Sequence, residues 1–346
     1  MIEIKAEYLN SLEKYKFIDL FSGIGGFHLA LSSFGAKCVF ASEIDKYAQK
    51  NYFENFGILP KGDITKINED EIPQHDILCA GFPCQAFSIS GKQLGFEDSR
   101  GTLFFEIARI TKYHKPKILF LENVSNFEKH DEQNTLKRVI KILESLNYKV
   151  YYKVLNSSHF GIPQNRERIY ILGFRKDILL EEFKFPNPPM IPIKLKNILL
   201  DDSEIQEFII NRDDIELKNK LIESDMFGNY PLEPIRIGQV NKGGQGERIY
   251  HEFGHAITLS AYGGGIGAKT GLYIINNKLR KLAPRECARL QGFPDLFKIE
   301  KSNTQAYKQF GNSVSVNVLQ YIIMEIISTL NGRKEKQINS ARLKYS

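Results

Sequence analysis

The sequence has few of the features that mark secreted, membrane-spanning or metal-binding proteins. Its four cysteines, at positions 38, 79, 84 and 287, form no CxxC pair, so we expect thiols in a reducing cytoplasm. The apolar tracts are short and interrupted by charges, so no membrane span of ~20 apolar residues is expected. Residues 1–16 mix acids and bases without the apolar core of a signal peptide. The seven histidines show no metal-ligand spacing, and we expect the two in HEFGH (251–255) to be solvated loop residues rather than ligands.

What is present is the composition of an ordinary globular protein of 346 residues, with 42% hydrophobic and 25% charged residues. A chain of this length is expected to form two domains, or one large domain with an insertion. The formal net charge of +6 is compatible with a polyanionic partner but does not require one.

The first 180 residues alternate short apolar runs with helical patterns. Strands are expected at 16–21, 37–43, 75–81, 117–123 and 168–174, and helices at 27–35, 45–57, 102–114 and 135–148. This alternation predicts an α/β fold with a mostly parallel, doubly wound sheet. The pattern changes at the proline-rich stretch 183–196. The glycine-rich stretch 243–267 then predicts loops and short strands, before helical patterns return at 283–293 and 317–330.

The glycine turn FSGIGG (21–26) follows the first expected strand and opens a helix, which is typical of a cofactor site. Glu43 follows Gly23 by twenty residues, at the end of the second expected strand, where a carboxylate commonly holds ribose hydroxyls. Asp63 is expected to close a third strand. The glycines are also explained by a tight strand–helix turn without any ligand. The combination of strand, glycine turn and acid does not distinguish a nicotinamide dinucleotide from S-adenosylmethionine.

Cys84 lies in GFPCQ, directly after an apolar run, and is either a small core residue or a nucleophile. Cys38 and Cys79 lie inside expected strands and fit the core interpretation better. Glu122 ends a later strand, at the edge where doubly wound sheets place their sites. Arg166 and Arg168 are expected on the same side of one strand, since side chains alternate along it.

Together these segments resemble the DNA (cytosine-5) methyltransferases. The motifs FSGIGG, GFPCQ, LENV, QNRERIYILGF, RKLAPRECARLQGFP and QFGNSV occur in the order and spacing of that family, and the resemblance covers roughly residues 16–331. It implies an S-adenosylmethionine-dependent, Rossmann-like fold with a smaller, mostly β or irregular target-recognition domain. The implied division is a catalytic and cofactor-binding domain at 1–196, target recognition at 197–283, a hinge at 284–311 and a C-terminal helix at 312–332 that packs back on the catalytic domain. The last fourteen residues, 333–346, carry five Lys or Arg against one Glu and are expected to form a basic, solvated tail.

The resemblance also implies the chemistry. The Cys84 thiolate adds to C6 of cytosine, and Glu122 contacts N3 and the exocyclic amine. Arg168 binds O2, and Arg166 helps to hold the site and the substrate. The implied cofactor is S-adenosylmethionine. The cofactor-binding positions are Phe21, Gly23, Gly25, Gly26, Glu43, Ile44, Asp63, Pro83, Leu103 and Asn312. Close relatives often carry Trp at the position of Ile44, and spacing alone makes Asn312 equally well a helix cap.

Sequence recognition is assigned to the variable region. The segments GGQGERIY (243–250) and AITLSAYGGG (256–265) match family members that modify the internal cytosine of GCGC. Arg248 is expected to bind a guanine edge, Gln245 and Ser90 to fill the space of a flipped cytosine, and Thr258 to contact a phosphate. Ser88, Tyr262 and Gly265 complete the expected DNA contacts. Without the resemblance, each of these is a surface loop residue, and HEFGH has no good match.

Three other functions compete with this interpretation. One branch of the family acts on RNA, a binding-only regulator needs no thiol, and a nicotinamide oxidoreductase leaves GFPCQ and QNRER unexplained. The expected partners are double-stranded DNA and a separately acting restriction endonuclease. We expect a monomer in the bacterial cytoplasm without a membrane partner.

Overall fold

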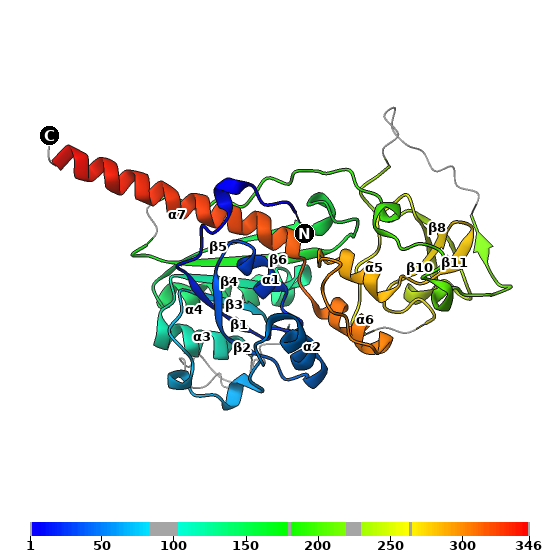
Figure 1. Cartoon of the computed structure of the whole chain (residues 1–346), viewed down its shortest axis with the longest axis horizontal. Coiled ribbons are helices and arrows are strands. Elements are labelled where there is room, and N and C mark those ends of the chain that lie inside the picture. The colour runs from blue at the N-terminus through cyan, green and yellow to red at the C-terminus, as the bar shows by residue number, and fades with distance from the viewer. Residues whose placement is uncertain (1, 84–102, 179–180, 219–229, 263–264, 345–346) are drawn as a thin grey trace.

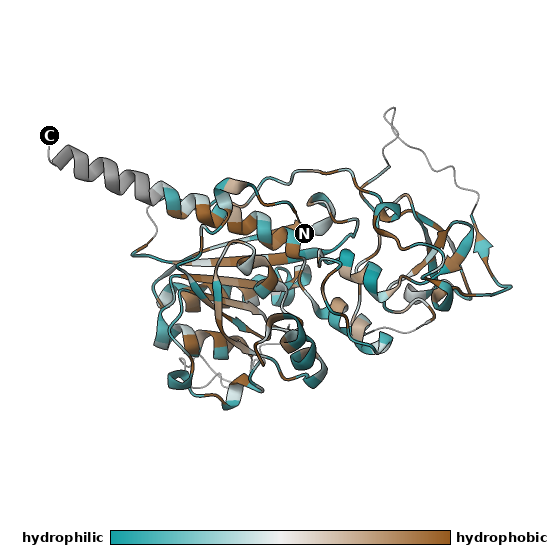
Figure 2. Cartoon of the chain, viewed as in Figure 1, coloured by the Kyte–Doolittle hydropathy of each residue, from teal (hydrophilic) through white to brown (hydrophobic). Residues whose placement is uncertain are grey.

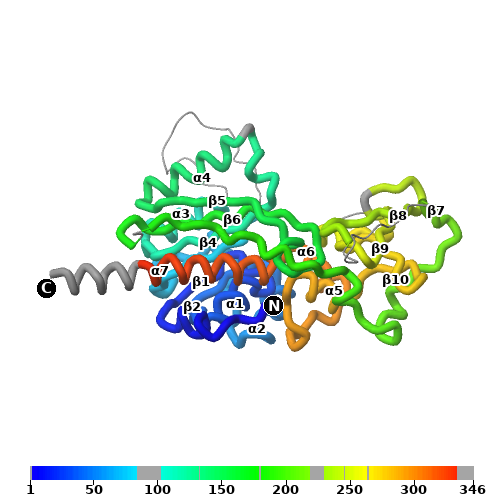
Figure 3. The backbone as a smooth tube through the Cα atoms, turned by 90° about the horizontal axis from the view of Figure 1, so that it is seen from above, coloured from blue at the N-terminus to red at the C-terminus, as the bar shows by residue number. Residues whose placement is uncertain are grey.

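A computed structural model of the chain describes residues 2–83, 103–178, 181–218, 230–262 and 265–344, with only the backbone at 132, 245 and 333–344. A six-stranded sheet forms the larger part and a five-stranded sheet the smaller part (Figures 1 and 3). The expected S-adenosylmethionine-dependent methyltransferase fold, a Rossmann-like α/β sheet, is confirmed.

The large sheet has the strand order β2-β1-β3-β4-β6-β5. Its strands are β1 (Lys16–Leu20), β2 (Lys37–Ser42), β3 (Ile77–Gly81), β4 (Ile118–Val124), β5 (Tyr148–Asn156) and β6 (Glu167–Arg175). The first four run parallel, while β6 lies antiparallel to both β4 and β5. Strand β5 was not predicted, because YKVYYKVLN contains no apolar run. It lies at the sheet edge, and only two of its nine residues are buried.

Helices cover both faces of this sheet, because successive apolar residues along each strand point to opposite faces. Phe17, Cys79 and Phe120 point into the core beneath α1 (Gly26–Ser32) and α7 (Val316–Lys344). Their neighbours along the same strands point into the opposite core, beneath α3 (Leu103–His114) and α4 (Asn134–Ser145). In Figure 1, α7 lies above the strands, and Figure 2 shows hydrophobic residues gathered on the strands and on the first half of α7.

Helix α2 (Lys46–Phe56) has the boundaries that its sequence predicts. The Asp45 carboxylate accepts hydrogen bonds from the backbone N–H groups of Tyr47, at 2.9 Å, and Ala48, at 3.2 Å. Gly57 ends the helix in the left-handed conformation, with φ 70°. These caps place the start of α2 immediately after β2, at the carboxyl edge of the sheet.

The smaller sheet has the order β11-β10-β9-β8-β7. Its strands are β7 (Glu216–Leu217), β8 (Arg236–Gln239), β9 (Arg248–His251), β10 (Leu272–Ile275) and β11 (Lys278–Arg280). They enclose a separate small core that includes Ile237, Ile249 and Leu272. This sheet lies within the range expected for target recognition. That assignment stays a prediction.

Helices α5 (Pro284–Arg289) and α6 (Asn303–Asn312) lie between the two sheets (Figure 3). The C-terminal helix α7 begins at Val316 rather than at 312 and continues through the expected tail to Lys344. Short 3-10 helices lie at Ala6–Tyr8, Ile64–Lys66, Glu69–Glu71, Ser125–Phe127, His130–Gln133, Ser157–His159, Leu195–Ile198, Gln206–Phe208 and Gln245–Glu247.

Within the described residues, one stretch, Asn303–Gly332, is long and apolar enough to cross a membrane by length and composition alone, which was not expected from the sequence. It comprises α6 and the first half of α7, and 67% of its most apolar window is buried inside the fold. Its hydrophobicity is explained by packing against α1 and the large sheet, as in the core helix of a globular protein.

The junction between the small sheet and α5 depends on a fully buried ion pair. Both Arg280 amino groups donate to the Glu286 carboxylate at 2.7 Å, and the two side chains are 1% and 0% exposed. We expect Arg280→Met to lower the free energy of unfolding by about 3–5 kcal/mol, because Glu286 loses its buried cation. Urea unfolding measures this change.

The matched control is Lys278→Met, because Lys278 lies on β11 with Arg280. This substitution breaks a more exposed ion pair, between Lys278 and Asp202. Its expected effect is below about 1 kcal/mol. Equal effects of the two substitutions would contradict a structural role for the buried pair.

Candidate active site

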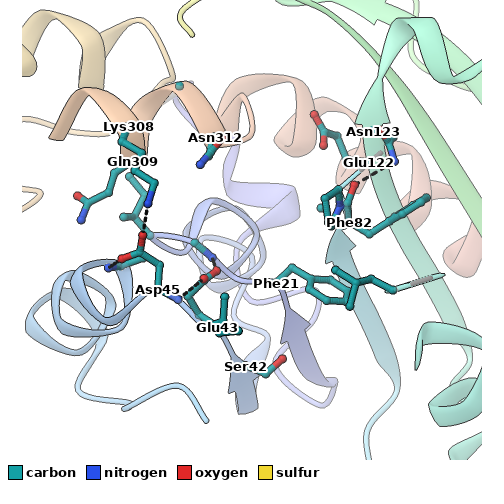
Figure 4. A pocket seen from close by; sticks show the side chains of 18 of the residues that line it. Phe21, Ser42, Glu43, Asp45, Phe82, Glu122, Asn123, Lys308, Gln309 and Asn312 are labelled. Atoms are coloured by element: carbon teal, nitrogen blue, oxygen red, sulfur yellow. Dashed lines mark hydrogen bonds and ion pairs between the residues drawn. The ribbon is translucent and has the colours of Figure 1, made fainter. Parts of the chain in front are cut away.

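A cavity of about 430 Å³ opens at the carboxyl edge of the large sheet. Much of its lining comes from the ends of β1–β4 and from α6 (Figure 4), with Arg168 at the start of β6 and Arg166 just before it. Eight of the expected cofactor residues line it: Phe21, Gly23, Glu43, Ile44, Asp63, Pro83, Leu103 and Asn312. Glu122, Arg166, Arg168 and Tyr262 line the same cavity. Eight of the ten expected cofactor residues and three of the four expected catalytic residues therefore line one cavity.

The glycine turn has an open side and a packed side. Gly23 adopts φ 53°, and nothing lies within 4 Å of where its Cβ would stand. Gly25 and Gly26 do not line the cavity, in contrast to the expectation. A Cβ on Gly25 would lie 2.3 Å from the Phe56 ring, and one on Gly26 would lie 2.4 Å from Val314. These two glycines permit close packing, while Gly23 leaves room for a ligand.

Glu43 holds the glycine turn and the start of α2 together. One carboxylate oxygen accepts from the backbone N–H of Gly23 and the other from that of Asp45, each at 2.8 Å. A carboxylate offers about four acceptor sites, so both oxygens retain capacity for ligand hydroxyl groups. Ile44, the next residue, is 71% exposed at the cavity rim.

Asp63 does not close a strand, which corrects the prediction. It caps the 3-10 helix Ile64–Lys66, and its carboxylate accepts from the Thr65 backbone N–H at 3.1 Å and from the Thr65 hydroxyl at 2.8 Å. Asp63 lines the cavity, but its sequence does not indicate that it precedes a short helix rather than ending a strand.

Glu122 and Arg168 form an ion pair at the other end of the cavity. Antiparallel pairing of β4 with β6 brings Val124 opposite Arg168 and Glu122 opposite Tyr170. The Arg168 Nε lies 3.2 Å from a Glu122 carboxylate oxygen. Burial raises the pKa of Glu122, with the charges of Arg168 and Arg166 opposing the rise. A carboxyl in this environment retains its proton to higher pH than an exposed one and can donate it.

Arg166 lies immediately before β6 and contacts three backbone carbonyls. Its guanidinium donates to Leu259 at 3.2 Å, Gly311 at 3.1 Å and Ser313 at 2.6 Å. Burial lowers its pKa to about 9, so it remains charged at neutral pH. Arg166 thereby ties the active site to α6 and to the segment that carries Thr258 and Tyr262.

Cys84, Ser88 and Ser90 lie outside the described residues. The chain leading to Cys84 is held by Asn123, whose side-chain amide donates to the Phe82 carbonyl at 2.9 Å. Asn123 lines the cavity next to Glu122. The end of β4 therefore positions both Glu122 and the residues that precede Cys84.

The expected DNA contacts fall into two groups, one at or beside the cavity and one in and near the small sheet. Tyr262, 71% exposed, lines the cavity, and the Thr258 hydroxyl donates to the Asn165 carbonyl at 2.6 Å beside Arg166. Arg248 is exposed at the start of β9, and Gly265 lies against Gly246 and Glu247. The side chain of Gln245 lies outside the described residues.

HEFGH is not a solvated loop, which corrects the prediction. His251 ends β9, and His255 is 1% exposed with its Nε2 2.8 Å from the Ile193 carbonyl oxygen. Burial lowers the pKa of His255 to about 4, so it stays neutral at physiological pH. Elements distant in sequence enclose His255: its ring lies beside Ile193, and its backbone N–H donates to the Glu233 carbonyl at 3.0 Å.

The three described cysteines, Cys38, Cys79 and Cys287, are buried. Burial raises the pKa of Cys38 to about 12 and also raises that of Cys79. The core interpretation of Cys38 and Cys79 is therefore correct, and thiolate chemistry at these positions is disfavoured.

Comparison with known proteins identifies the class to which this fold and cavity belong. The model of the family described as C-5 cytosine-specific DNA methylase matches residues 15–328, and the chain belongs to that family. Among individual relatives, the type II methyltransferase M.HhaI of Haemophilus parahaemolyticus is 58% identical, over 96% of this chain and 99% of that protein. M.HpaII of Haemophilus parainfluenzae is 43% identical over 93% and 92% of the two chains. The crystal structure of S. pombe Dnmt2 methyltransferase covers 92% of this chain and 99% of its own, with TM-score 0.70 and 22% identity, and shares the fold.

The protein is thus a DNA (cytosine-5) methyltransferase of the type II restriction–modification class. Members of this family use S-adenosylmethionine. The cavity fits that cofactor, because apolar Phe21, Pro83 and Leu103 surround a space into which Glu43 presents its carboxylate, and Gly23 leaves the wall open. S-adenosylmethionine supplies the methyl group from its sulfonium.

Proposed function

We propose that the protein methylates the internal cytosine of GCGC in double-stranded DNA and so protects host DNA from a cognate endonuclease. The observation that carries the proposal is the single cavity that joins Glu43 and Phe21 at one end to Glu122 and Arg168 at the other. Such a cavity lets a methyl donor and a base meet. The segments GGQGERIY and AITLSAYGGG support GCGC as the target.

The proposed reaction begins at Cys84. Its thiolate attacks C6 of cytosine and forms an S–C6 bond, and the electron pair of the C5–C6 bond makes C5 nucleophilic. Glu122 donates a proton or a hydrogen bond to N3 as charge develops there. C5 then takes the methyl group from the sulfonium, whose S–CH3 bond breaks to leave S-adenosylhomocysteine as the second product. A base removes the C5 proton, and the S–C6 bond breaks to release Cys84. Overall, a proton leaves C5 and a methyl group replaces it.

Arg168 is proposed to bind O2 of the base while it remains paired with Glu122. The 3.2 Å contact supports this role, since the guanidinium has further N–H donors beyond the one facing Glu122. Arg166 is proposed to help hold the site and the substrate. Its Nη1 and Nη2 bind the carbonyls of Leu259, Gly311 and Ser313, which fix the guanidinium at the cavity wall.

Access to C6 requires the cytosine to leave the base stack, so the proposal includes base flipping. Ser90 and Gln245 would occupy the vacated space, and Thr258 would contact the neighbouring phosphate. Arg248, exposed at the start of β9, is proposed to bind a guanine edge in the major groove. Ser88, Tyr262 and Gly265 complete the proposed DNA contacts. We further propose that the enzyme acts as a monomer in the bacterial cytoplasm.

Bisulfite sequencing of plasmid DNA incubated with the protein and S-adenosylmethionine tests the proposal. Protected cytosines confined to the internal position of GCGC are the expected result. Protection at another motif would overturn GCGC and direct attention to residues 241–267, while the reaction would stand. Full conversion of every cytosine would contradict DNA methylation by this chain and leave RNA or binding alone as its function.

A further inference from the structure

Two charged side chains with no assigned role in the reaction face each other at the cofactor end of the cavity. The Lys308 ammonium lies 2.6 Å from an Asp45 carboxylate oxygen, and both residues line the cavity. They are 263 residues apart in sequence. Figure 4 shows Lys308 reaching from α6 to Asp45 beside Glu43. The contact therefore joins α6 to the cofactor-binding loop after β2.

On the loop side, Asp45 is directly coupled to Glu43. The Asp45 backbone N–H donates to one Glu43 carboxylate oxygen, and the Gly23 backbone N–H donates to the other. The Asp45 side chain also caps α2 through Tyr47 and Ala48. A shift of Asp45 would thus move the carboxylate proposed to hold the ribose.

On the helix side, Lys308 and Asn312 lie four residues apart and so share one face of α6. Asn312 lines the cavity, as does Gly311, whose carbonyl accepts from Arg166. A Cβ on Gly311 would lie 2.3 Å from the Ala261 backbone nitrogen, so the end of α6 is closely packed. Nearer the start of α6, the Lys308 side chain extends from this face to the Asp45 carboxylate.

We propose that Lys308 is a positioning residue for the cofactor, whose ion pair with Asp45 holds α6 and Asn312 against the loop that carries Glu43. This inference rests on the proposed cofactor site. The two side chains are only 31% and 24% exposed, so solvent screens their attraction incompletely. The hydrogen bond to Asp45 also raises the pKa of Lys308, which keeps the ammonium charged.

The test measures cofactor affinity without DNA, by isothermal titration with S-adenosylmethionine and with S-adenosylhomocysteine. Lys308→Met keeps the length of the side chain without its charge. Asp45→Asn removes the charge but preserves the helix cap, because asparagine caps as well as aspartate. We expect each substitution to raise Kd about three- to tenfold.

The double variant should bind about as weakly as either single variant, because the first substitution already breaks the pair. Lys308→Arg should restore most of the affinity. With saturating cofactor, kcat of Lys308→Met should change less than about twofold, since the role is positioning. A merely structural lysine would give additive losses and no rescue by arginine.

The matched control is Lys117→Met. Lys117 pairs with Asp76 at 2.8 Å, at the opposite edge of the same sheet, and its loss should leave Kd unchanged. Wild-type Kd values for both Lys308→Met and Asp45→Asn would overturn the inference. Glu43→Ala separates this failure from that of the cofactor site, because normal binding by Glu43→Ala would overturn the site itself.

Discussion

Replacing Cys84 by serine is expected to lower methyl transfer to DNA by about a thousandfold or more. A serine hydroxyl is not ionised at neutral pH and adds poorly to C6, so C5 stays unreactive. Binding of DNA and of S-adenosylmethionine should persist, because neither requires the thiol. Transfer of a radiolabelled methyl group measures the loss, and a gel-shift assay measures DNA binding.

Cys38→Ser is the matched control. Cys38 is buried in β2, with its sulfur near the Phe40 carbonyl and the Tyr52 hydroxyl, and a serine hydroxyl can make the same contacts. We expect the control to retain methyl transfer. Normal turnover by the Cys84 variant would contradict the covalent mechanism, whatever the control shows.

Glu122→Gln is expected to slow methyl transfer by about 10²–10⁴-fold, the usual range for losing a positioned proton donor. It should also change the dependence on pH. Burial raises the pKa of Glu122, so the protonated carboxyl is present below that pKa and is lost as pH rises through it. The wild-type rate should therefore acquire a falling alkaline limb that the glutamine variant lacks, because an amide does not ionise in this range.

Single-turnover rates measured across pH check this expectation, since they isolate the chemical step from product release. Glu144→Gln, an exposed position on α4, is the control and should keep the wild-type profile. An unchanged alkaline limb in Glu122→Gln would assign that limb to another group and contradict the proposed proton donor.

Much of the fold was predictable because its signals are local. Buried strands appear as apolar runs, and Asp45 and Gly57 mark the two ends of α2. Prediction failed where burial comes from distant neighbours. The edge strand β5 contains no apolar run, His255 is buried within a polar segment, and Asp63 caps a short helix instead of closing a strand.

The sequence by itself determined the family and the chemical groups, because the motifs around Cys84, Glu122 and Arg168 are short, specific and continuous in the chain. Only the tertiary structure decided how those groups act on one another. Antiparallel pairing brings Glu122 to Arg168, and burial then raises the Glu122 pKa. Packing of α6 likewise brings Lys308 to Asp45. The physical reason is that the distance between two side chains and the desolvation of a carboxylate depend on the whole fold. A short stretch of sequence determines neither.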